Sequence, residues 1–255
     1  MIELKNISGG YGKKQVLFNI NAVMASGEIT SIIGPNGCGK STLLEIASGL
    51  MKPSGGIVLR DGINIHSMEP KNRAKKVSVL SQQKNPGALT VRSLVYHGRF
   101  PYLGYPRKYS ETDRTIVDEA MKTAGIYDIA EESLSELSGG QQQKAYIAML
   151  LAQNTDIVFL DEPVTFLDIN YQLELMEIIR ELKNMGKTVI MVIHDLNLAM
   201  CCSDKIIAMK NGRAVFDGNA EKMYESRVLE DIFGVKANYS IENGQYFFTR
   251  ARSVI

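Results

Sequence analysis

A glycine-rich segment at residues 34–42 has the residue types and spacing of a phosphate-binding loop, between an apolar run at 29–33 and a helical stretch at 40–48. Glycine at its first, fourth and sixth positions permits turns and close approaches that direct backbone N–H groups at phosphate oxygens. Lys40 can reach the β- and γ-phosphates, and the Ser41 hydroxyl can ligate Mg²⁺. The candidate nucleotide-contacting residues are Gly34, Pro35, Asn36, Gly37, Cys38, Gly39, Lys40, Ser41 and Thr42.

The start of the following helix adds a second contribution. Its backbone N–H groups present the positive end of the helix dipole to a bound anion. Gly49 is placed to end the helix. Cys38 lies beside the same helix start, a position that favours thiolates, so we expect bound nucleotide to slow its reaction with a maleimide.

Two acidic residues follow another apolar run. Residues 157–160 read as a buried strand that ends in Asp161 and Glu162. Because ligands bind at the carboxyl ends of the strands in a parallel α/β sheet, we expect Asp161 to lie near the phosphate loop and to hold Mg²⁺ through water. Glu162 is the candidate general base or water-orienting group. The alternative is that the pair belongs to a solvated turn before Pro163.

The elements that must position these groups alternate along the chain. Apolar runs that read as strands are separated by segments with helical spacing. Strands with apolar residues on both faces, divided by helices, indicate an α/β fold with a mainly parallel core sheet covered on both sides. The expected strands are 29–33, 77–80, 157–160 and 188–193, and the expected helices are 139–153 and 169–185. In the last helix, Ile169, Leu173, Met176, Ile179 and Leu182 share one face.

Two further segments differ in character. Residues 1–32 read as short β segments, which predict an N-terminal antiparallel β subdomain. Residues 84–136 contain several Gly and Pro residues and then a helical stretch with a capping box at Ser110. We therefore expect a single domain over 1–240 with an inserted helical subdomain at about 84–136. Residues 241–255 are expected to add a closing strand and tail to the same domain.

Composition and charge narrow the function classes. The net charge of the 255 residues is +1, so no global field recruits nucleic acid or an acidic membrane surface. No apolar stretch reaches the roughly 18–20 residues that span a bilayer, and the start of the chain lacks the apolar core of a secretory signal. Three cysteines without metal spacing suggest a reducing compartment, and we expect Cys201 and Cys202 to be small buried residues. These features predict a cytoplasmic protein with no nucleic-acid partner.

A third motif, Leu-Ser-Gly-Gly-Gln at 137–141, resembles the signature loop of ATP-binding cassette (ABC) ATPases. With the two motifs above, it makes the chain similar to a P-loop NTPase of the ABC cassette type. Its physical role would be phosphate recognition by a hydroxyl and by glycine N–H groups at a helix start. The resemblance implies a head-to-tail homodimer in which this loop covers the ATP of the other subunit. The residues concerned are Ser138, Gly139, Gly140 and Gln141.

Other positions match the same family in order along residues 1–240. Tyr11 matches the aromatic residue that stacks on adenine. Gln82, with Gln83 as the neighbouring alternative, matches the glutamine that contacts Mg²⁺ and water. Leu167-Asp168 matches the loop that crosses the dimer interface, and His194 matches the histidine that contacts the γ-phosphate. The resemblance thus implies ATP and Mg²⁺ as cofactors, with catalytic Glu162, His194, Gln82 and Lys40 and metal ligands Ser41, Gln82 and Asp161.

Residues 98–101, 141–148 and 165–172 resemble, more closely, the ATPases of importers for iron-siderophore, haem, cobalamin and related metal chelates. The resemblance implies two integral-membrane permease subunits that dock near Gln82 and residues 83–107, and indirectly an extracytoplasmic substrate-binding protein. The ATPase would lie on the inner face of the cell membrane. The chain departs from the importer pattern, in which His or Arg is usual, at or near Tyr102, Gln142, Lys144 and Tyr171.

Several alternatives stay open at this level. An ABC ATPase of an exporter, or of a transporter with another cargo, would share every nucleotide motif. ABC proteins of DNA repair have a long coiled coil and those of translation usually have two cassettes, and this sequence has neither pattern. A non-transport ABC protein that uses ATP as a switch also fits, whereas the signature motif and His194 argue against a small-molecule kinase. The cargo itself is not encoded in the nucleotide motifs.

Overall fold

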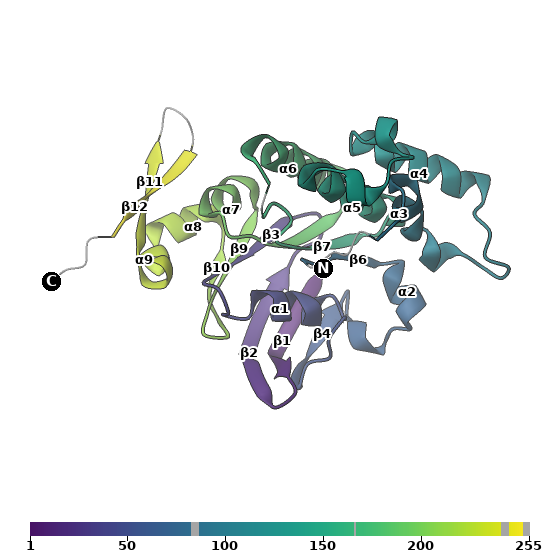
Figure 1. The fold of residues 1–255 in the computed structure, drawn as a ribbon. Coiled ribbons are helices and arrows are strands. Elements are labelled where there is room, and N and C mark those ends of the chain that lie inside the picture. Colours follow the sequence, from purple (N-terminus) through teal and green to yellow (C-terminus); the bar gives the residue numbers. More distant parts are fainter. Residues whose placement is uncertain (83–86, 166, 241–244, 252–255) are drawn as a thin grey trace. The chain divides into compact units, whose positions relative to one another are not determined.

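The computed structural model describes residues 1–82, 87–165, 167–240 and 245–251. The chain forms two compact units, and Figure 1 colours their elements along the sequence from purple to yellow. Unit 1 comprises residues 1–67 and 188–255, and unit 2 comprises residues 68–187. The phosphate-loop segment therefore belongs to unit 1, and the segments with Asp161 and Ser138 belong to unit 2.

The first sheet of unit 1 is antiparallel, with the strand order β2-β1-β4-β5. In β2, buried Leu17, Ile20, Ala22 and Met24 are separated by partly or fully exposed residues, as expected where only one face of a sheet is covered. This sheet confirms the predicted antiparallel β subdomain. Its strands are β1 (Ile2–Tyr11), β2 (Lys14–Met24), β4 (Gly55–Arg60) and β5 (Ile63–Asn64).

The second sheet of unit 1 holds the strands that flank the phosphate loop. β3 pairs in parallel with both β8 and β9, and β10 adds to β9 in antiparallel fashion. Every residue of β3 and β8 is buried, because strands in the middle of a parallel sheet are covered on both faces. The strands are β3 (Ile29–Ile33), β8 (Thr188–Val192), β9 (Lys205–Lys210) and β10 (Arg213–Gly218).

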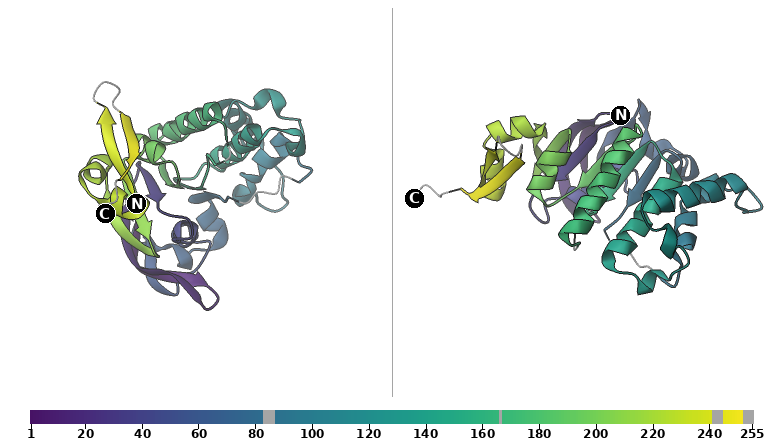
Figure 2. Two further views of the ribbon diagram at one scale, coloured as in Figure 1. Left: turned by 60° about the vertical axis from the view of Figure 1, so that its left-hand side comes forward. Right: turned by 90° about the horizontal axis from the view of Figure 1, so that it is seen from above.

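The remaining elements of unit 1 cover these sheets or follow them. α1 (Lys40–Ala47) packs on β1 and β8, and α7 (Leu196–Cys202) packs on β3. The C-terminal part is a separate two-stranded ribbon in which β12 contacts α7 and β11 contacts α9 (Figure 2). Its elements are α8 (Ala220–Glu225), α9 (Val228–Phe233), β11 (Val235–Ser240) and β12 (Gln245–Arg250), and a 3₁₀ turn lies at Ile65–Ser67.

Unit 2 combines two parallel strands with most of the helices. β6 (Val77–Leu80) pairs with β7 (Ile157–Asp161), whose five residues are all buried. α5 packs on α3, α4 and β6. The helices are α2 (Pro70–Ala74), α3 (Val91–His97), α4 (Glu111–Thr123), α5 (Gly139–Gln153) and α6 (Ile169–Asn184), with 3₁₀ turns at Phe100–Tyr102, Tyr127–Ile129 and Leu134–Glu136.

These elements confirm the predicted α/β class, with mainly parallel core strands and helices over most of 91–136. The predicted capping box at Ser110 is present at the start of α4. The expected start of the insertion, near residue 84, lies outside the described residues, and so does part of the expected closing strand and tail at 241–255. The assignment of 1–240 to one domain stays a prediction.

The expectation that Cys201 and Cys202 are buried was wrong. Cys201 is exposed and Cys202 is half-buried at the end of α7, whereas the preceding Ala199 and Met200 are buried. In α6, Met176, Ile179 and Leu182 are buried as the shared face suggests. Ile169 and Leu173 on that face are 65% and 51% exposed. The first part of the apolar face of α6 is therefore exposed to solvent, and only the later part packs in the core.

Candidate functional site

In unit 1 the phosphate loop joins β3 to α1 through three glycines with positive φ. The φ angles are 152° at Gly34, 75° at Gly37 and 104° at Gly39. A Cβ atom at Gly34 would lie 2.4 Å from the carbonyl oxygen of Met209, and one at Gly39 would lie 2.6 Å from Cδ2 of Leu17. The loop therefore has a backbone path that residues with side chains cannot follow without strain.

Lys40 lies inside this loop. Its side chain is 5% exposed, and its Nζ donates to the carbonyl oxygens of Gly34, at 2.9 Å, and Pro35, at 3.1 Å. Gly39 is the N-cap residue of α1, and no side chain caps this helix within the part of the chain that the structure describes. A buried ammonium group and a helix start are thus gathered in one turn of backbone, which is the arrangement that binds phosphate.

Cys38 behaves differently from the expectation. It is 6% exposed, and this burial raises the pKa of its thiol above the ordinary value. The nearby charge of Lys40 and backbone N–H groups lower the pKa by less than burial raises it. The expected thiolate at this helix start is therefore wrong, because desolvation of the thiol outweighs the favourable local field.

Tyr11 ends β1 and reaches α1. Its hydroxyl donates to Oε2 of Glu45 at 2.8 Å, and Thr42 Oγ1 lies 3.5 Å from the same hydroxyl. The residue is nevertheless 52% exposed. A tethered aromatic ring with an open face, close to the helix that follows the phosphate loop, is suited to stack on a flat base.

His194 lies at the same end of the sheet as the phosphate loop. β3 and β8 are parallel, with Ile32 opposite Val192, and Ile193 N donates to Ile32 O at 3.2 Å. Continuing this register places the exposed His194 at the level of Gly34, two residues beyond each paired strand end. The structure thus brings these two predicted site residues to one edge.

In unit 2 a second group of predicted residues meets in the same way. β6 and β7 are parallel, with Leu80 opposite Leu160, so both strands end at one edge. Gln82 Nε2 donates to Oε2 of Glu162 at 2.7 Å, and Thr165 Oγ1 donates to the same oxygen at 3.3 Å. Asp161 is 8% exposed, and Glu162 is half-buried with a φ of 52°. Gln83, the alternative to Gln82, lies outside the described residues.

The signature segment forms the start of α5. Ser138 is the N-cap residue, and its Oγ accepts from the backbone N–H of Gln141 at 3.3 Å, while Ser138 N donates to Gln141 Oε1 at 3.0 Å. Ser138 and Gly139 are exposed. Gly140 is buried, because the ring of Tyr171 lies where its Cβ would be, 2.6 Å from that position. Hydroxyl and N–H groups are thus presented at a capped helix start.

Sequence reasoning missed two residues that hold this part of unit 2 together. Thr165 orients Glu162, as described above. Gln143 is 8% exposed, and its Nε2 donates to the carbonyl oxygen of Pro163 at 2.5 Å, which ties α5 to the segment behind Glu162. The available signal was a glutamine among apolar residues on the inner face of a predicted helix, which needs a hydrogen-bond partner.

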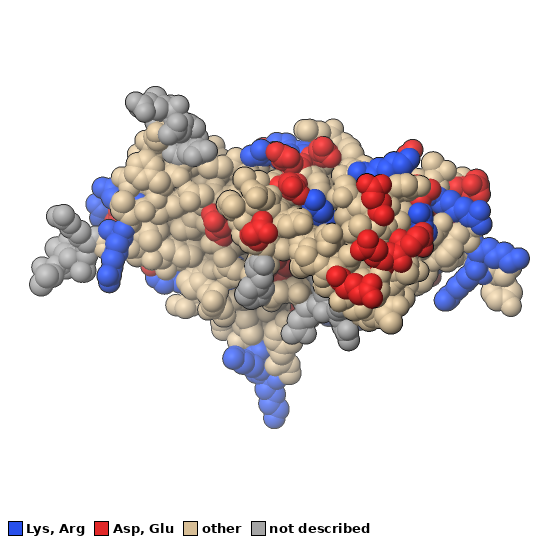
Figure 3. Space-filling model, turned by 45° about the horizontal axis from the view of Figure 1, so that its top comes forward, with Lys and Arg blue, Asp and Glu red and all other residues tan. Residues whose placement is uncertain are grey.

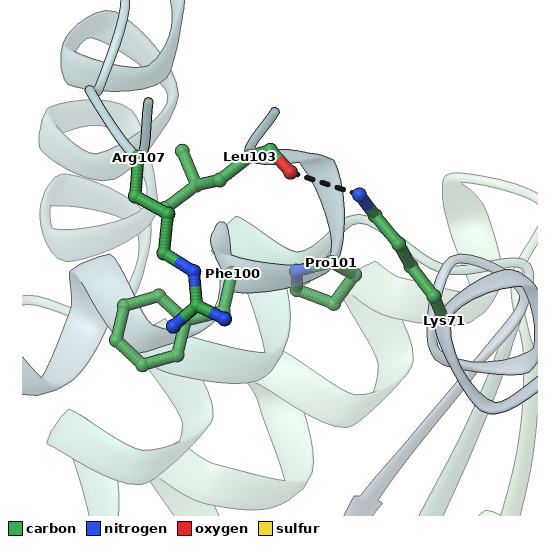
Figure 4. Close-up of a pocket in the computed structure, with 5 residues that line it drawn as sticks. All are labelled: Lys71, Phe100, Pro101, Leu103 and Arg107. Atoms are coloured by element: carbon green, nitrogen blue, oxygen red, sulfur yellow. Dashed lines mark hydrogen bonds between the residues drawn. The ribbon is translucent and has the colours of Figure 1, made fainter. Parts of the chain in front are cut away.

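A pocket of about 330 Å³ lies on unit 2, and none of the site residues described above lines it (Figure 4). Two cationic side chains and apolar groups line it, and Lys71 Nζ donates to Leu103 O at 2.9 Å. All of its lining residues except Lys71 belong to the predicted docking segment at 83–107. The lining residues are Lys71, Phe100, Pro101, Leu103 and Arg107.

Charge on the face in Figure 3 is mixed, with acidic and basic side chains interspersed, in keeping with a net charge of +1. Within the described ranges, no helix is both long and apolar enough to cross a membrane.

A family model described as ABC transporter matches residues 17–165, which include the phosphate loop, the signature segment and the Asp161–Glu162 pair. This chain belongs to the ABC transporter family. Membership confirms the predicted cassette fold and ATP as the nucleotide of the family.

Three relatives of this ABC protein are similar over most of their length. The petrobactin import ATP-binding protein of Bacillus subtilis is 44% identical over 235 residues, covering 91% of this chain and 92% of that protein. The iron(3+)-hydroxamate import ATP-binding protein of Bacillus subtilis is 40% identical over 230 residues, covering 89% and 86%. The ferric enterobactin transport ATP-binding protein of Escherichia coli is 42% identical over 229 residues, covering 89% and 84%.

Solved ABC structures agree with the fold. The dimeric structure of a bacterial ABC transporter cassette is 34% identical and has a TM-score of 0.77, covering 86% of this chain and 99% of that chain. The dimeric post-hydrolysis state of such a cassette, bound to ADP and Pi, is 32% identical with a TM-score of 0.76 and the same coverage. These ABC structures are dimers, in agreement with the dimer that the resemblance implies for this chain.

Proposed function

We propose that this chain is the ATP-hydrolysing subunit of an ABC importer that energises uptake of a metal chelate, with ferric chelates first among the candidates. One observation carries the proposal. Three proteins with petrobactin import, iron(3+)-hydroxamate import and ferric enterobactin transport in their names are 44%, 40% and 42% identical to it over about nine-tenths of its length.

The phosphate loop is the proposed site of the ATP triphosphate. Its positive-φ glycines, the buried Nζ of Lys40 and the start of α1 fit an anion that has several oxygens to satisfy. Tyr11 would stack on the adenine, and His194 would contact the γ-phosphate from the neighbouring strand end.

Glu162 is the proposed base or water-orienting group. Two donors, Gln82 Nε2 and Thr165 Oγ1, bind its Oε2 and fix the orientation of the carboxylate. A carboxylate held in this way is prepared to accept a proton from water without first reorienting. A positioned base contributes about 10²–10⁴ in rate.

Mg²⁺ is the proposed second cofactor. Ser41, Gln82 and Asp161 would supply a hydroxyl, an amide and a carboxylate, the hard oxygen donors that Mg²⁺ takes in proteins. When bound with the nucleotide, Mg²⁺ neutralises charge on the phosphates. Within this chain, the ammonium group of Lys40 would also neutralise charge on the phosphates, from the phosphate loop.

The proposed assembly is a homodimer with two permease subunits. Ser138, Gly139, Gly140 and Gln141 of one subunit would meet the ATP that the other subunit binds. The pocket at Lys71, Phe100 and Arg107 is the proposed contact with a permease segment (Figure 4). An extracytoplasmic binding protein would deliver the cargo. The ATPase would then work on the cytoplasmic side of the cell membrane.

The substitution Glu162→Gln tests the catalytic part. It keeps size and polarity but removes the proton acceptor, so we expect ATP binding within about twofold of the parent and hydrolysis lower by about 10²–10⁴. Calorimetry and phosphate release measure the two quantities. Glu177→Gln, an exposed glutamate on α6, is the control and should change neither. Hydrolysis within a few-fold of the parent would remove Glu162 from its role.

The transport part is tested in the native organism. A strain lacking this gene should lose uptake of a radiolabelled ferric hydroxamate, a ferric catecholate, haem or cobalamin. The wild-type gene should restore that uptake and the Glu162→Gln gene should not. Normal uptake of every chelate in the deletion strain would contradict the importer proposal and favour another transporter or an ATP-dependent switch.

A further inference from the structure

The starts of two helices in unit 2 interlock. α5 begins after its cap Ser138, and α6 begins after its cap Asp168, whose Oδ1 accepts from the N–H groups of Asn170 and Tyr171 at 3.1 Å each. The ring of Tyr171 fills the space beside Gly140, with Cγ 2.6 Å from the position of an added Cβ. The first turn of each helix is thus in direct contact with the first turn of the other.

A second pair of residues braces this contact one turn further along each helix. Lys144 Nζ lies 5.2 Å from the centroid of the Tyr171 ring and forms an ion pair with Glu174. The Lys144 side chain is 17% exposed and that of Glu174 is 51% exposed, so water screens the attraction of Lys144 to the ring and the carboxylate only in part. Two residues of α5, Gly140 and Lys144, and two of α6, Tyr171 and Glu174, therefore form one cluster of contacts.

The first turn of α6 is held mainly by polar contacts and by Tyr171, and Gln172 Nε2 donates to Leu167 O at 2.9 Å and to Val164 O at 3.4 Å. Ile169 is 65% exposed and Leu173 is 51% exposed, whereas Met176 and Ile179 further along are buried. Apolar packing therefore holds the later turns of α6, while the Asp168 cap, the Gln172 hydrogen bonds and the contacts of Tyr171 hold the first, and of these only Tyr171 reaches α5.

We propose that Tyr171, braced by Lys144, is a positioning residue that joins the signature segment to the segment at 167–168, so that both meet the ATP-bound second subunit as one rigid piece. The proposal rests on the proposed function, in which Ser138 and Gly139 contact ATP bound by the other copy. Without the ring, the two helix starts would have to be ordered when the dimer closes. That ordering would weaken ATP-dependent dimerisation and leave nucleotide binding by a single subunit unchanged.

The test uses the full chain with Glu162→Gln, which blocks turnover. ATP-dependent dimerisation is followed by sedimentation, and nucleotide affinity of the monomer is measured with a fluorescent ATP analogue at low protein concentration. Tyr171→Ala should weaken dimerisation about tenfold or more, and Tyr171→Phe, which keeps the ring, should stay within about twofold. Tyr127→Ala is the matched control, because Tyr127 also has a cation over its ring, with Lys122 Nζ at 5.2 Å and Arg92 at 5.7 Å, but belongs to neither α5 nor α6.

Two results would overturn the inference. One is a Tyr171→Ala protein that dimerises as tightly as the parent. The other is a protein that loses monomer nucleotide affinity or thermal stability to the same extent as dimerisation, since this is what a merely structural residue would do. If Tyr171→Ala does not fold, Lys144→Gln decides, with weaker dimerisation expected and unchanged dimerisation refuting the brace. A parent that stays monomeric in saturating ATP would overturn this inference and the proposed dimer together.

Discussion

The phosphate loop and the signature segment are both glycine-rich helix starts, and glycine has a different purpose in each. In the phosphate loop, Gly34, Gly37 and Gly39 have φ angles of 152°, 75° and 104°, so glycine provides a backbone conformation. At the signature, Gly139 and Gly140 are part of a regular helix. Gly140 provides space there, because Tyr171 occupies the volume of a Cβ.

The two helix starts also differ in their caps. α1 begins at Gly39 without a side-chain cap in the described structure, whereas Ser138 and Gln141 cap α5 reciprocally. No capping side chain therefore competes with an anion at the start of α1, while Ser138 has to serve its own helix as well as a ligand. We therefore expect the phosphate loop to bind ATP tightly in a single subunit. We expect the signature segment to contact ATP only when the dimer closes.

The largest expected effect sharpens this contrast. Lys40→Ala should weaken ATP binding roughly 100-fold, because a charge-assisted hydrogen bond to a phosphate contributes about 2–3 kcal/mol. Ser138→Ala should leave ATP binding by one subunit unchanged. Calorimetry on both variants measures the difference, with the exposed Lys13→Ala as control. Unchanged binding in Lys40→Ala would remove Lys40 from the site.

The next effect concerns space at Gly140. Gly140→Ala places a Cβ 2.6 Å from the Tyr171 ring, and overpacking of this kind costs about 1–3 kcal/mol. Urea unfolding should show that loss, and Tyr171→Ala in the same chain should recover most of it. If the double variant is no more stable than Gly140→Ala alone, the ring is not the reason for glycine at this position.

A smaller loss of stability is expected at Gly37, where glycine provides a backbone conformation rather than space. No atom lies within 4 Å of an added Cβ, but the φ of 75° makes Gly37→Ala cost about 1 kcal/mol in the free energy of unfolding. Gly139→Ala is the matched control, with equally open space at a helix start, and should not destabilise the protein. Equal urea midpoints for the two variants would break the distinction between conformation and space.

The smallest effect is kinetic and concerns Cys38. Its raised pKa leaves less thiolate at neutral pH, so maleimide should label it several-fold more slowly than the exposed Cys201. The labelling rate should rise with pH, with a midpoint above that of a free small thiol, and Mg-ATP should slow it further. Mass spectrometry of labelled peptides follows both cysteines. Faster labelling of Cys38 than of Cys201 at pH 7 would contradict its burial.

Much of the fold and of the candidate site could be predicted from the sequence. Strand and helix types follow from apolar periodicity, and the motifs at 34–42, 137–141 and 161–162 are local patterns whose chemistry depends on neighbouring residues. Parallel pairing was enough to predict that Gln82 and Glu162, or Gly34 and His194, lie at strand ends. Family membership then followed from the order of these motifs.

Only the tertiary structure decided which side chains meet. The Tyr171 ring against Gly140, the hold of Thr165 on Glu162, and the link from Gln143 to Pro163 each join separate segments, and so depend on packing rather than on spacing. The pKa of Cys38 was predicted in the wrong direction because the sequence shows the helix start but not the depth of burial. Local backbone preferences are encoded by neighbouring residues, whereas desolvation and contact are properties of the folded chain as a whole.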